Sequence, residues 1–426
     1  MRLLYTTLFF IGIPLIILRL IWRGFSISAY WQRWAERFGK SPFISEDNPV
    51  IWIHAVSVGE VEACRPLVKK LRSEYPKYQL LITTMTPTGS ERVKLLFEDS
   101  VSHCYLPYDL PFAINQFIDR TNPQFGIIME TEIWPNLIFL CQKRAIPLVL
   151  ANARLSQRSA KAYGRFRKFI KSILQNLTLI ATQGQKDRKR FQDLGADIEK
   201  IHAIGSLKYE ISLPASLKEQ ANAMRHLWDH NRPVFVAAST HEGEEEIVIN
   251  ASRTIRAKFP DLLLIIVPRH PQRFDRVAAL ASKSGFKILR RSEQRPCPAD
   301  VQILIVDTMG ELPLFYAASD VAFVGGSLVA RGGHNILEPA ALGRAIVTGS
   351  HYFNFNEITN DFLAAKAAIK VDDTQSLADT TITLLQNPQQ RAQMGEAALQ
   401  LIAGSQNAST HLINLIKYNI THHAPE

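Results

Sequence analysis

The amino-acid sequence predicts an α/β protein made of two Rossmann-like domains, each built on a doubly wound parallel sheet. Its 426 residues exceed what one ordinary hydrophobic core holds, so two domains are expected. Short apolar runs alternate with helical patterns along most of the chain, which is typical of parallel sheets covered by helices. An apolar stretch over residues 3–18 adds an N-terminal transmembrane anchor helix to this architecture.

The composition indicates a globular protein with an anionic partner. Hydrophobic residues make up 46% of the chain and charged residues 21%, which excludes an intrinsically disordered chain. The net charge of +10 favours nucleic acid, a membrane surface or an acidic substrate as the partner. The four cysteines are far apart in the sequence, which argues against a disulfide scaffold or a zinc site and suits a reducing compartment. They are Cys64, Cys104, Cys141 and Cys297.

Residues 1–42 are predicted to form a membrane anchor and an interfacial segment. The apolar stretch continues past Arg19 to Trp22, so a span of roughly 20 residues requires Arg19 to reach the membrane interface. Cationic residues are few before the stretch and many after it, and the positive-inside rule therefore leaves the rest of the chain in the cytoplasm. A cleaved signal peptide ending near Ser28 is the alternative, but the charge order and the cysteines favour the uncleaved anchor. Residues 30–34 are interpreted as an interfacial belt of aromatic and basic side chains.

Residues 43–207 are predicted to form the first domain. Apolar runs that are short and nearly continuous indicate strands buried on both faces, and helical patterns lie between them. Sheets of this kind bind their ligands beyond the carboxyl ends of the strands, so the residues that follow each run are of interest. The runs interpreted as strands are residues 50–55, 80–83, 125–129, 148–151, 177–181 and 201–204.

Three charged residues follow strands of this domain and are candidates for catalysis. Glu60 lies at a turn between the first strand and a helix, where complementing the helix dipole is an equally good explanation. Glu130 directly follows an apolar run, where an acid is seldom buried without a partner. Lys208 follows the last strand, a position that surface lysines also occupy. His54, inside the first strand, is interpreted as a core histidine.

Residues 154–171 are predicted to form a basic amphipathic helix. Cationic side chains alternate with aromatic ones, a pattern that suits an anionic membrane face or a phosphate-bearing lipid. A solvated helix face explains any single residue equally well. Because the same chain carries an anchor, we expect a membrane surface and no nucleic acid as the partner. The cationic residues are Arg154, Arg158, Lys161, Arg165, Arg167, Lys168 and Lys171.

A polar segment, residues 208–231, is predicted to be a linker, after which strands and helices alternate again over a second domain, residues 232–404. Four strand ends are expected to meet at one edge of its sheet. Arg269 lies between prolines at one of these ends, where an anion clamp is expected. Residues 405–426 are predicted to form a last helix that packs back toward the first domain. The strands of the second domain are interpreted as residues 234–238, 262–267, 303–306 and 321–324.

The stretch from Gly325 to Pro339 carries four glycines between a strand and a predicted helix. Glycine permits positive φ and close approach of the backbone to a ligand. A helix beginning near Asn335 adds unpaired N–H groups, so we expect a cradle for phosphate. A capping box, with Asn335 at the N-cap and Glu338 three residues on, explains those two residues locally and is compatible with the cradle. The turn fits neither the G-x-G-x-x-G nor the P-loop motif.

Four separated motifs resemble those of 3-deoxy-D-manno-octulosonic acid (Kdo) transferases, family 30 glycosyltransferases that act in lipopolysaccharide inner-core biosynthesis. The resemblance extends from the N-terminal anchor to the last helix. It implies the GT-B fold, in which two Rossmann-like domains face a central cleft. The motifs are HAVSVGE (residues 54–60), METEIWPN (129–136), PRHP (268–271) and GGHNILEP (332–339).

This resemblance implies transfer of Kdo from CMP-Kdo to the 6′-hydroxyl of a tetraacylated lipid A precursor, lipid IVA, with inversion at the anomeric carbon. Glu60 matches the family's general base, and Glu130 and Lys208 match groups that stabilise the transition state. Whether one or two Kdo residues are added stays open. The residues implied in binding CMP are Pro268, Arg269, Met309, Gly310, Glu311, Asn335, Ile336, Leu337 and Glu338.

We expect neither a metal nor any other cofactor, because a CMP-sugar leaves as a monophosphate and offers no diphosphate for a metal to bridge. The resemblance places the protein at the inner membrane, with its domains on the cytoplasmic face. A GT-B enzyme that uses a UDP-sugar is one alternative. A membrane-anchored nucleotide-binding module without catalysis is another, although it has no use for Glu60. A Rossmann dehydrogenase is disfavoured because the first strand lacks a G-x-G-x-x-G turn.

Overall fold

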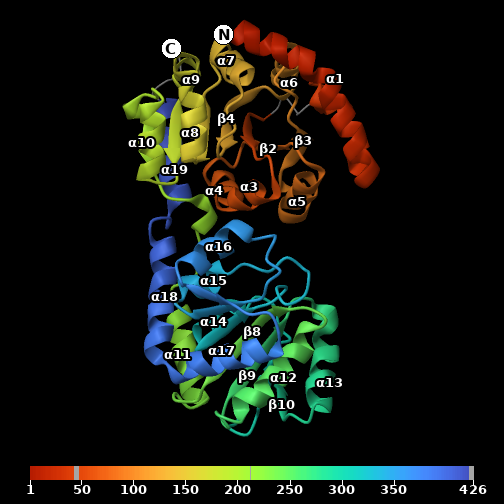
Figure 1. Ribbon diagram of the computed structural model, residues 1–426, viewed down its shortest axis with the longest axis vertical. Coiled ribbons are helices and arrows are strands. Elements are labelled where there is room, and N and C mark those ends of the chain that lie inside the picture. The colour runs from red at the N-terminus through yellow and green to blue at the C-terminus, as the bar shows by residue number, and fades with distance from the viewer. Residues whose placement is uncertain (43–47, 212, 422–426) are drawn as a thin grey trace. The chain divides into compact units, whose positions relative to one another are not determined.

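The computed structural model describes residues 1–42, 48–211 and 213–421, which divide into two compact units (Figure 1). Unit 1 comprises Met1–Glu210 and Gly404–Glu426, and unit 2 comprises Ile211–Ala403. The expected start of the first domain at residue 43, residue 212 of the expected linker and residues 422–426 of the expected last segment lie outside the described residues.

Unit 1 is built on a seven-stranded parallel sheet with the strand order β3-β2-β1-β4-β5-β6-β7. The chain proceeds from β1 toward one edge and then, from β4, toward the other edge. The central strands β1 and β5 are buried along their whole length, because helices cover both faces of the sheet, and this explains their continuous apolar runs. The strands are β1 (Val50–His54), β2 (Gln79–Thr84), β3 (Ser102–Tyr105), β4 (Pro123–Met129), β5 (Leu148–Ala153), β6 (Leu179–Thr182) and β7 (Ile201–Ala203).

The helices of unit 1 bury apolar side chains in two clusters. One cluster includes residues of α3, α4, α5 and α19, and the other includes residues of α6, α7, α9 and α10. Helix α19 comes from the far end of the sequence and packs against α4 and β6. The helices are α1 (Arg2–Ser26), α2 (Trp34–Arg37), α3 (Val58–Ala63), α4 (Arg65–Glu74), α5 (Pro87–Phe97), α6 (Pro111–Thr121), α7 (Pro135–Lys143), α8 (Gln157–Gly164), α9 (Arg167–Leu174), α10 (Gln185–Asp193) and α19 (Ala408–Thr421).

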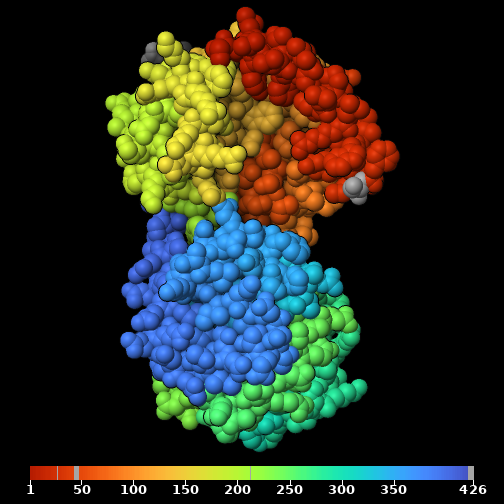
Figure 2. Space-filling view, in the orientation of Figure 1, coloured from red at the N-terminus to blue at the C-terminus, as the bar shows by residue number. Residues whose placement is uncertain are grey.

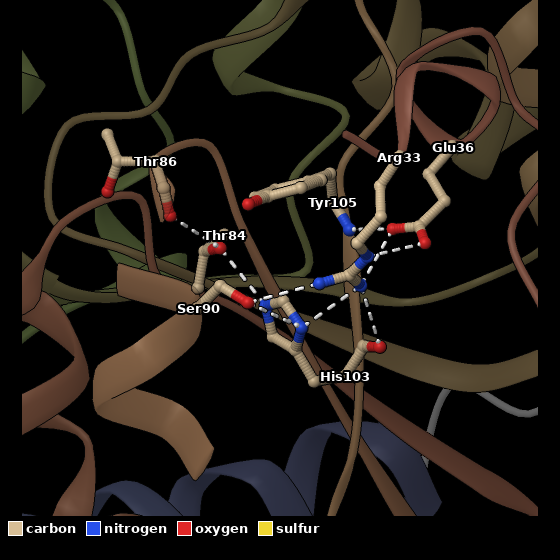
Figure 3. A network of polar contacts seen from close by, with 7 residues as sticks. All are labelled: Arg33, Glu36, Thr84, Thr86, Ser90, His103 and Tyr105. Carbon is tan, nitrogen blue, oxygen red and sulfur yellow. Dashed lines mark hydrogen bonds and ion pairs between the residues drawn. The ribbon is translucent and has the colours of Figure 1, made fainter. Parts of the chain in front are cut away.

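The segment that follows α1 folds into unit 1. Arg33 donates to both carboxylate oxygens of Glu36, at 2.7 and 2.8 Å, and also to the carbonyl oxygen of His103 at 3.2 Å (Figure 3). Glu36 in turn accepts the Tyr105 N–H at 2.8 Å. Arg37 is 1% exposed, and its guanidinium lies 4.1 Å from the centroid of the Tyr105 ring. Arg33 and Arg37 thus have carboxylate or aromatic partners inside unit 1.

Unit 2 repeats the architecture with a second seven-stranded parallel sheet, ordered β10-β11-β9-β8-β12-β13-β14. Helix α11 lies within the segment expected to be a linker and packs against α14, so most of that segment belongs to unit 2. The strands are β8 (Val234–Thr240), β9 (Leu263–Pro268), β10 (Ile288–Arg290), β11 (Ile303–Ile305), β12 (Val321–Val324), β13 (Ala345–Thr348) and β14 (Ala368–Lys370). The helices are α11 (Leu217–Leu227), α12 (Glu244–Arg256), α13 (Phe274–Lys283), α14 (Leu312–Ala317), α15 (Leu337–Ala341), α16 (Asn356–Ala364), α17 (Thr374–Gln386) and α18 (Pro388–Ala403).

Four strands of the structure are missing from the sequence prediction: β3, β10, β13 and β14. β3, β10 and β14 lie at sheet edges, where a strand has one neighbour and needs fewer apolar residues. β13 is a short apolar run that comes soon after helix α15. Helix α15 ends before it because Gly343, with φ of 62°, turns the chain into the strand.

The basic helix predicted over residues 154–171 is two helices in the structure, α8 and α9. Gly164, a poor helix former, ends α8, and α9 begins at Arg167. Because α9 is a separate helix, its residues Ile170 and Ile173 pack in the hydrophobic core. All seven cationic residues of this stretch stay exposed.

Candidate functional site

The carboxyl ends of β1 and β4 lead to the first two candidate residues, Glu60 and Glu130. These strands are neighbours, and β1 pairs with β2 on its other side, so the strand order of unit 1 reverses between β1 and β4. Ligands of doubly wound sheets bind at such a reversal. The fold therefore brings both sequence-predicted acids to the edge of the sheet where a ligand is expected.

Glu60 lies in the first turn of α3 and is 8% exposed. Its carboxylate accepts the Val56 N–H at 2.8 Å and the Ser57 hydroxyl at 3.0 Å, while Ser57 caps the helix. Burial raises the pKa of Glu60 to about 8, the Val56 N–H opposes this rise, and the carboxylates of Glu130 and Glu132 add to it. Glu60 is thus a buried carboxyl group beside two other acids, not an exposed charge that only complements the helix dipole.

Glu130 forms an ion pair with Lys208. Glu130 Oε1 lies 2.7 Å from Lys208 Nζ, and the two side chains are 20% and 12% exposed. Glu130 has φ of 59°, a conformation that costs a non-glycine residue about 1–3 kcal/mol and is concentrated at functional sites. The pair unites two of the predicted catalytic residues, and Lys208 is the partner that an acid directly after a buried strand requires.

Asn152, which sequence reasoning did not single out, holds the loop that carries Lys208. Asn152 is buried at the end of β5, and its Oδ1 accepts the Leu207 N–H at 3.0 Å. The N–H of the preceding residue, Ser206, donates to Ser405 Oγ at 3.0 Å, so the segment before α19 fixes the same loop. The available signal was a polar residue at the carboxyl end of an apolar run, the same signal that identified Glu130.

Two further polar residues lie near this edge of the sheet. Glu132 accepts the Trp134 Nε1–H at 2.7 Å, and burial raises its pKa. His54 is completely buried, with Nδ1 2.9 Å from Thr83 Oγ1, and burial lowers its pKa to about 3. His54 is therefore a neutral core histidine, as expected, whereas Glu132 belongs to the cluster of acids around Glu60.

The four glycines that follow β12 in unit 2 pack against other parts of the chain. Gly326, Gly332 and Gly333 have positive φ values of 68°, 94° and 72°. A Cβ on Gly325 would lie 2.7 Å from the Ser239 carbonyl oxygen, and one on Gly333 would lie 3.1 Å from a backbone atom of residue 352. Close packing of chain on chain accounts for these glycines, so their presence does not by itself require a ligand.

The N–H groups at the start of this turn donate to a carboxylate of the protein itself. Glu244, the first residue of α12, is fully buried. It accepts the N–H groups of Gly326 at 2.7 Å, Ser327 at 3.0 Å and Leu328 at 2.9 Å, and also that of His241 at 2.9 Å. The anion held by these groups is therefore Glu244, which sequence reasoning missed although three acids in a row open this helix.

A pair of histidines lies beside the glycine turn. His241 Nε2 is 2.8 Å from His334 Nε2, and the two rings are nearly parallel, with 7° between their planes. Burial lowers the pKa of His241 to about 4 and that of His334 to about 3, and the charge of Arg269 contributes in both cases. Arg269 itself is exposed beyond the buried Pro268, and its N–H donates to the Thr240 carbonyl oxygen at 3.0 Å. At neutral pH the pair is uncharged beside an arginine, so one Nε2–H donates to the other ring.

Helix α15 begins at Leu337, two residues after Asn335. Asn335 Oδ1 accepts the Leu337 N–H at 3.0 Å, while Ile336 occupies the N-cap position. The capping box predicted for Asn335 and Glu338 is therefore wrong, because Asn335 closes a tight turn before the helix. With five residues, α15 is also much shorter than the helix that was expected to face a phosphate.

Met309, Gly310 and Glu311 lie beyond the carboxyl end of β11. Met309 is 64% exposed, and Gly310 has φ of 85°. Glu311 accepts a hydrogen bond of 2.8 Å from Arg291, which lowers the pKa of the glutamate. These residues form a second group at the edge of the sheet, with an exposed thioether and a fixed carboxylate.

Comparison with known proteins gives matches over almost the whole chain. Residues 32–211 match the family described as 3-Deoxy-D-manno-octulosonic-acid transferase (kdotransferase), and residues 226–401 match Glycosyl transferases group 1. The 3-deoxy-D-manno-octulosonic acid transferase of Haemophilus influenzae is 43% identical over 418 residues, which cover 98% of each chain. The corresponding enzyme of Bordetella pertussis is 35% identical over 378 residues, 86% of each chain.

Among solved structures, MurG of Acinetobacter baumannii covers 87% of this chain and 99% of its own, with a TM-score of 0.50 and 11% identity. At this identity the likeness concerns the fold alone, and together with the two parallel sheets it confirms the predicted GT-B class. The family of the chain is assigned instead from relatives that are similar to it in sequence over most of their length. On that basis the chain belongs to the 3-deoxy-D-manno-octulosonic acid (Kdo) transferase family of glycosyltransferases.

Proposed function

We propose that this Kdo transferase moves Kdo from CMP-Kdo to the 6′-hydroxyl of a tetraacylated lipid A precursor, with inversion at the anomeric carbon and Glu60 as the general base. The observation that carries the proposal is the position of Glu60, which is buried beside the half-buried Glu130 and Glu132 at the reversal of strand order in unit 1. An acceptor hydroxyl has to lose a proton as it attacks, and a carboxylate with a raised pKa is suited to take it.

In a single displacement, Glu60 removes the proton of the acceptor hydroxyl while its oxygen forms a bond to the anomeric carbon of Kdo. The bond between that carbon and the CMP phosphate breaks, and its electron pair leaves with the phosphate. One displacement of this kind inverts the configuration. At pH 7 only about a tenth of Glu60 is ionised with a pKa of about 8, but this fraction is a stronger base than an ordinary carboxylate.

Lys208 supplies the positive charge of the site in this proposal, and Glu130 holds it in place. The ammonium group offsets charge that develops on the Kdo carboxylate or on the departing phosphate. Glu130 lies 2.7 Å away and fixes the position of a flexible side chain. This assigns the acidic Glu130 an indirect role, which explains how a carboxylate assists a reaction that generates negative charge.

We assign binding of the CMP part of the donor to unit 2. Arg269 is exposed at a strand end, where its guanidinium can pair with the phosphate. The exposed Met309 side chain is available to contact the base, and Glu338 can accept hydrogen bonds from ribose hydroxyls. Because Glu244 occupies the N–H groups of residues 326–328, we assign the phosphate to Arg269 and not to that part of the glycine turn.

Transfer should occur with CMP-Kdo as the donor and should be inhibited by CMP much more strongly than by UDP. The test uses detergent-extracted protein, CMP-Kdo and the lipid A precursor, and product mass gives the number of Kdo residues added. Equal inhibition by UDP, or transfer from a UDP-sugar, would favour the alternative donor. Absence of any transfer with a correctly folded protein contradicts the assigned acceptor or donor.

We also propose that transfer needs no divalent metal. The leaving group is a nucleoside monophosphate, which offers no diphosphate for a metal to bridge, and cationic side chains can offset its charge. The rate in excess EDTA is therefore expected to equal the rate in magnesium within twofold. A loss of activity in EDTA that magnesium restores would show that a metal takes part.

Replacement of Lys208 by alanine is expected to lower kcat about 100- to 1,000-fold, since it removes a preorganised charge from the site. If Glu130 acts by holding Lys208, the change Glu130→Gln should have a clear effect in the wild type and almost none in the Lys208→Ala background. Steady-state rates of the two single variants and the double variant test this coupling. Additive effects would mean that Glu130 acts on the substrate independently.

The lipid acceptor makes a membrane location part of the proposal. We propose attachment to the cytoplasmic face of the inner membrane through α1, whose residues Arg2–Phe25 are long and apolar enough to span a bilayer by length and composition. The exposed cationic residues of α8 and α9 support attraction to anionic lipid, and no nucleic-acid partner is proposed.

A further inference from the structure

Helix α1 has two apolar faces, and they have different surroundings. The inner face packs on unit 1, where Phe9, Ile13, Ile16 and Leu20 join a cluster with Leu110 of the loop before α6. The outer face is a stripe with alternating spacings of four and three residues, so its members align along one side of the helix. The residues of this outer stripe are 54–76% exposed: Leu4, Leu8, Ile11, Leu15, Leu18, Trp22 and Phe25.

The N-terminal end of α1 is docked on unit 1 by polar contacts. Arg2 Nε and the Thr6 hydroxyl both donate to Asn136 Oδ1 at 3.0 Å, and the Arg2 guanidinium lies 5.1 Å from the Phe139 ring centroid. The backbone N–H of Asn136 is held by Asp109, which accepts it at 2.9 Å. These contacts tie the first turns of α1 to the start of α7.

The C-terminal end of α1 is docked on the same unit. Leu20 is buried, and Arg23 Nη1 lies 3.3 Å from the hydroxyl of Tyr30, which belongs to the same apolar cluster. In Figure 2 the atoms of α1, at the red end of the colour scale, lie along the outside of unit 1. The helix therefore contacts one folded body at both of its ends.

A helix that crosses a bilayer cannot keep both sets of contacts. With 25 residues α1 is about 37 Å long, and the hydrocarbon core is about 30 Å thick. A spanning arrangement would therefore place Arg2 and Arg23 on opposite sides of the membrane. The contacts of Arg2 with Asn136 and of Arg23 with Tyr30 would then require unit 1 to lie on both sides at once.

We infer that α1 lies in the plane of the membrane, with its outer stripe in a single leaflet and its inner face on unit 1, and does not cross the bilayer. This inference rests on the proposed membrane attachment and replaces the spanning anchor expected from the sequence. It treats α1 as an integral part of unit 1 whose outer stripe is covered by lipid.

The charges around α1 match an anionic leaflet better than a second copy of this basic protein. Arg19 is exposed on the outer face of α1. Helix α1 contacts α7, and α7 contacts the basic helix α9 (Figure 1). Phe166, between α8 and α9, is 56% exposed among those cations. Exposed apolar and cationic side chains on one folded unit are typical of proteins that bind at a membrane surface.

The docking of α1 also connects the anchor to the loop that bears the acids. Asn136 is the last residue of the segment that begins with Glu130 and includes Glu132. Its side chain receives Arg2 and Thr6 from α1. If α1 lies in the plane of the membrane, it therefore holds this loop close to the leaflet that contains the lipid acceptor.

The first test locates the N-terminus of the full chain. An epitope tag placed before Met1 is treated with protease in inside-out vesicles, which expose the cytoplasmic side, and in spheroplasts, which expose the other side. We expect cleavage only in inside-out vesicles. Cleavage only in spheroplasts overturns the in-plane arrangement, whereas recovery of the protein in the soluble fraction means that the proposed attachment itself is wrong.

The second test compares neighbouring residues on the two faces, using vesicles of phosphatidylethanolamine and phosphatidylglycerol. Leu15→Asp on the outer stripe should lower vesicle binding at least tenfold with an unchanged Tm. Ile16→Ala on the inner face should retain binding and lower Tm by about 4 °C. Equal responses of the two variants overturn the inference, as does a Leu15→Asp protein that loses self-association but still binds vesicles.

Discussion

Replacing Glu60 by glutamine is expected to lower kcat for Kdo transfer about 100- to 10,000-fold and to leave CMP binding unchanged. Glutamine preserves the shape of the side chain and can still accept the Val56 N–H, but it cannot take a proton from the acceptor. Product formation by mass and CMP affinity by calorimetry measure the two expectations separately. Glu62→Gln, on the same short helix, makes the same substitution on a side chain paired with Arg92 and should stay active.

The pH dependence gives an independent signature of Glu60. In the wild type, kcat/KM should rise with pH and level off above about 8, the pKa to which burial raises this carboxyl group. Full activity of Glu60→Gln, or a wild-type rate that is flat between pH 6 and pH 9, would exclude Glu60 as the base. Glu130 and Glu132 would then be the next residues to test.

The same titration links catalysis to stability. Between pH 4.5, the ordinary pKa, and about pH 8 the folded protein holds a proton on Glu60 that the unfolded chain has lost. The unfolding free energy therefore falls as the pH rises through this range, because ionisation is disfavoured only in the folded state. The Tm of Glu60→Gln should exceed that of the wild type at pH 9 and equal it near pH 4.

Replacing Glu244 by glutamine is expected to cost unit 2 at least about 3 kcal/mol of stability and to abolish donor binding. The carboxylate accepts four backbone N–H groups in a fully buried position, and an amide group presents an N–H₂ where two of these donors now point. The loss of two buried hydrogen bonds should loosen residues 326–328 and, through His241, disturb the histidine pair. Thermal unfolding and CMP calorimetry measure both consequences.

Glu246→Gln is the matched control for this change. Glu246 lies in the same first turn of α12 but is exposed, so its neutralisation should shift Tm by less than about 1 °C. If Glu244→Gln matched the control in both Tm and CMP affinity, the buried carboxylate would not be what shapes the glycine turn.

The sequence by itself determined the class of the fold and most of its central strands. Strands β1, β4, β8 and β9 are buried on both faces, so each must be a nearly continuous apolar run, and such runs are visible without a structure. Edge strands such as β3 and β14 lack this constraint, and local sequence does not reveal them.

The sequence also indicated which charged residues lie at the carboxyl ends of strands, because strand ends can be located from the apolar runs. It did not determine what those residues contact. Lys208 follows β7, three strands away from β4 in the sheet, and it reaches Glu130 because Asn152 and Ser405 hold its loop in place. A pairing between residues so far apart in the chain depends on how loops pack, not on local pattern.

Tertiary structure decided the environment of the remaining features in the same way. The glycine turn looked like a site for an external anion, but a carboxylate from another strand end, Glu244, occupies its N–H groups. Helix α1 is long and apolar enough to span a membrane, and the structure adds that Asn136 and Tyr30 contact its two ends. Composition and spacing report what a segment can bury or bind, whereas its actual partner is fixed only when distant segments come together, since hydrogen bonds and apolar contacts act over a few ångströms of space and not along the sequence.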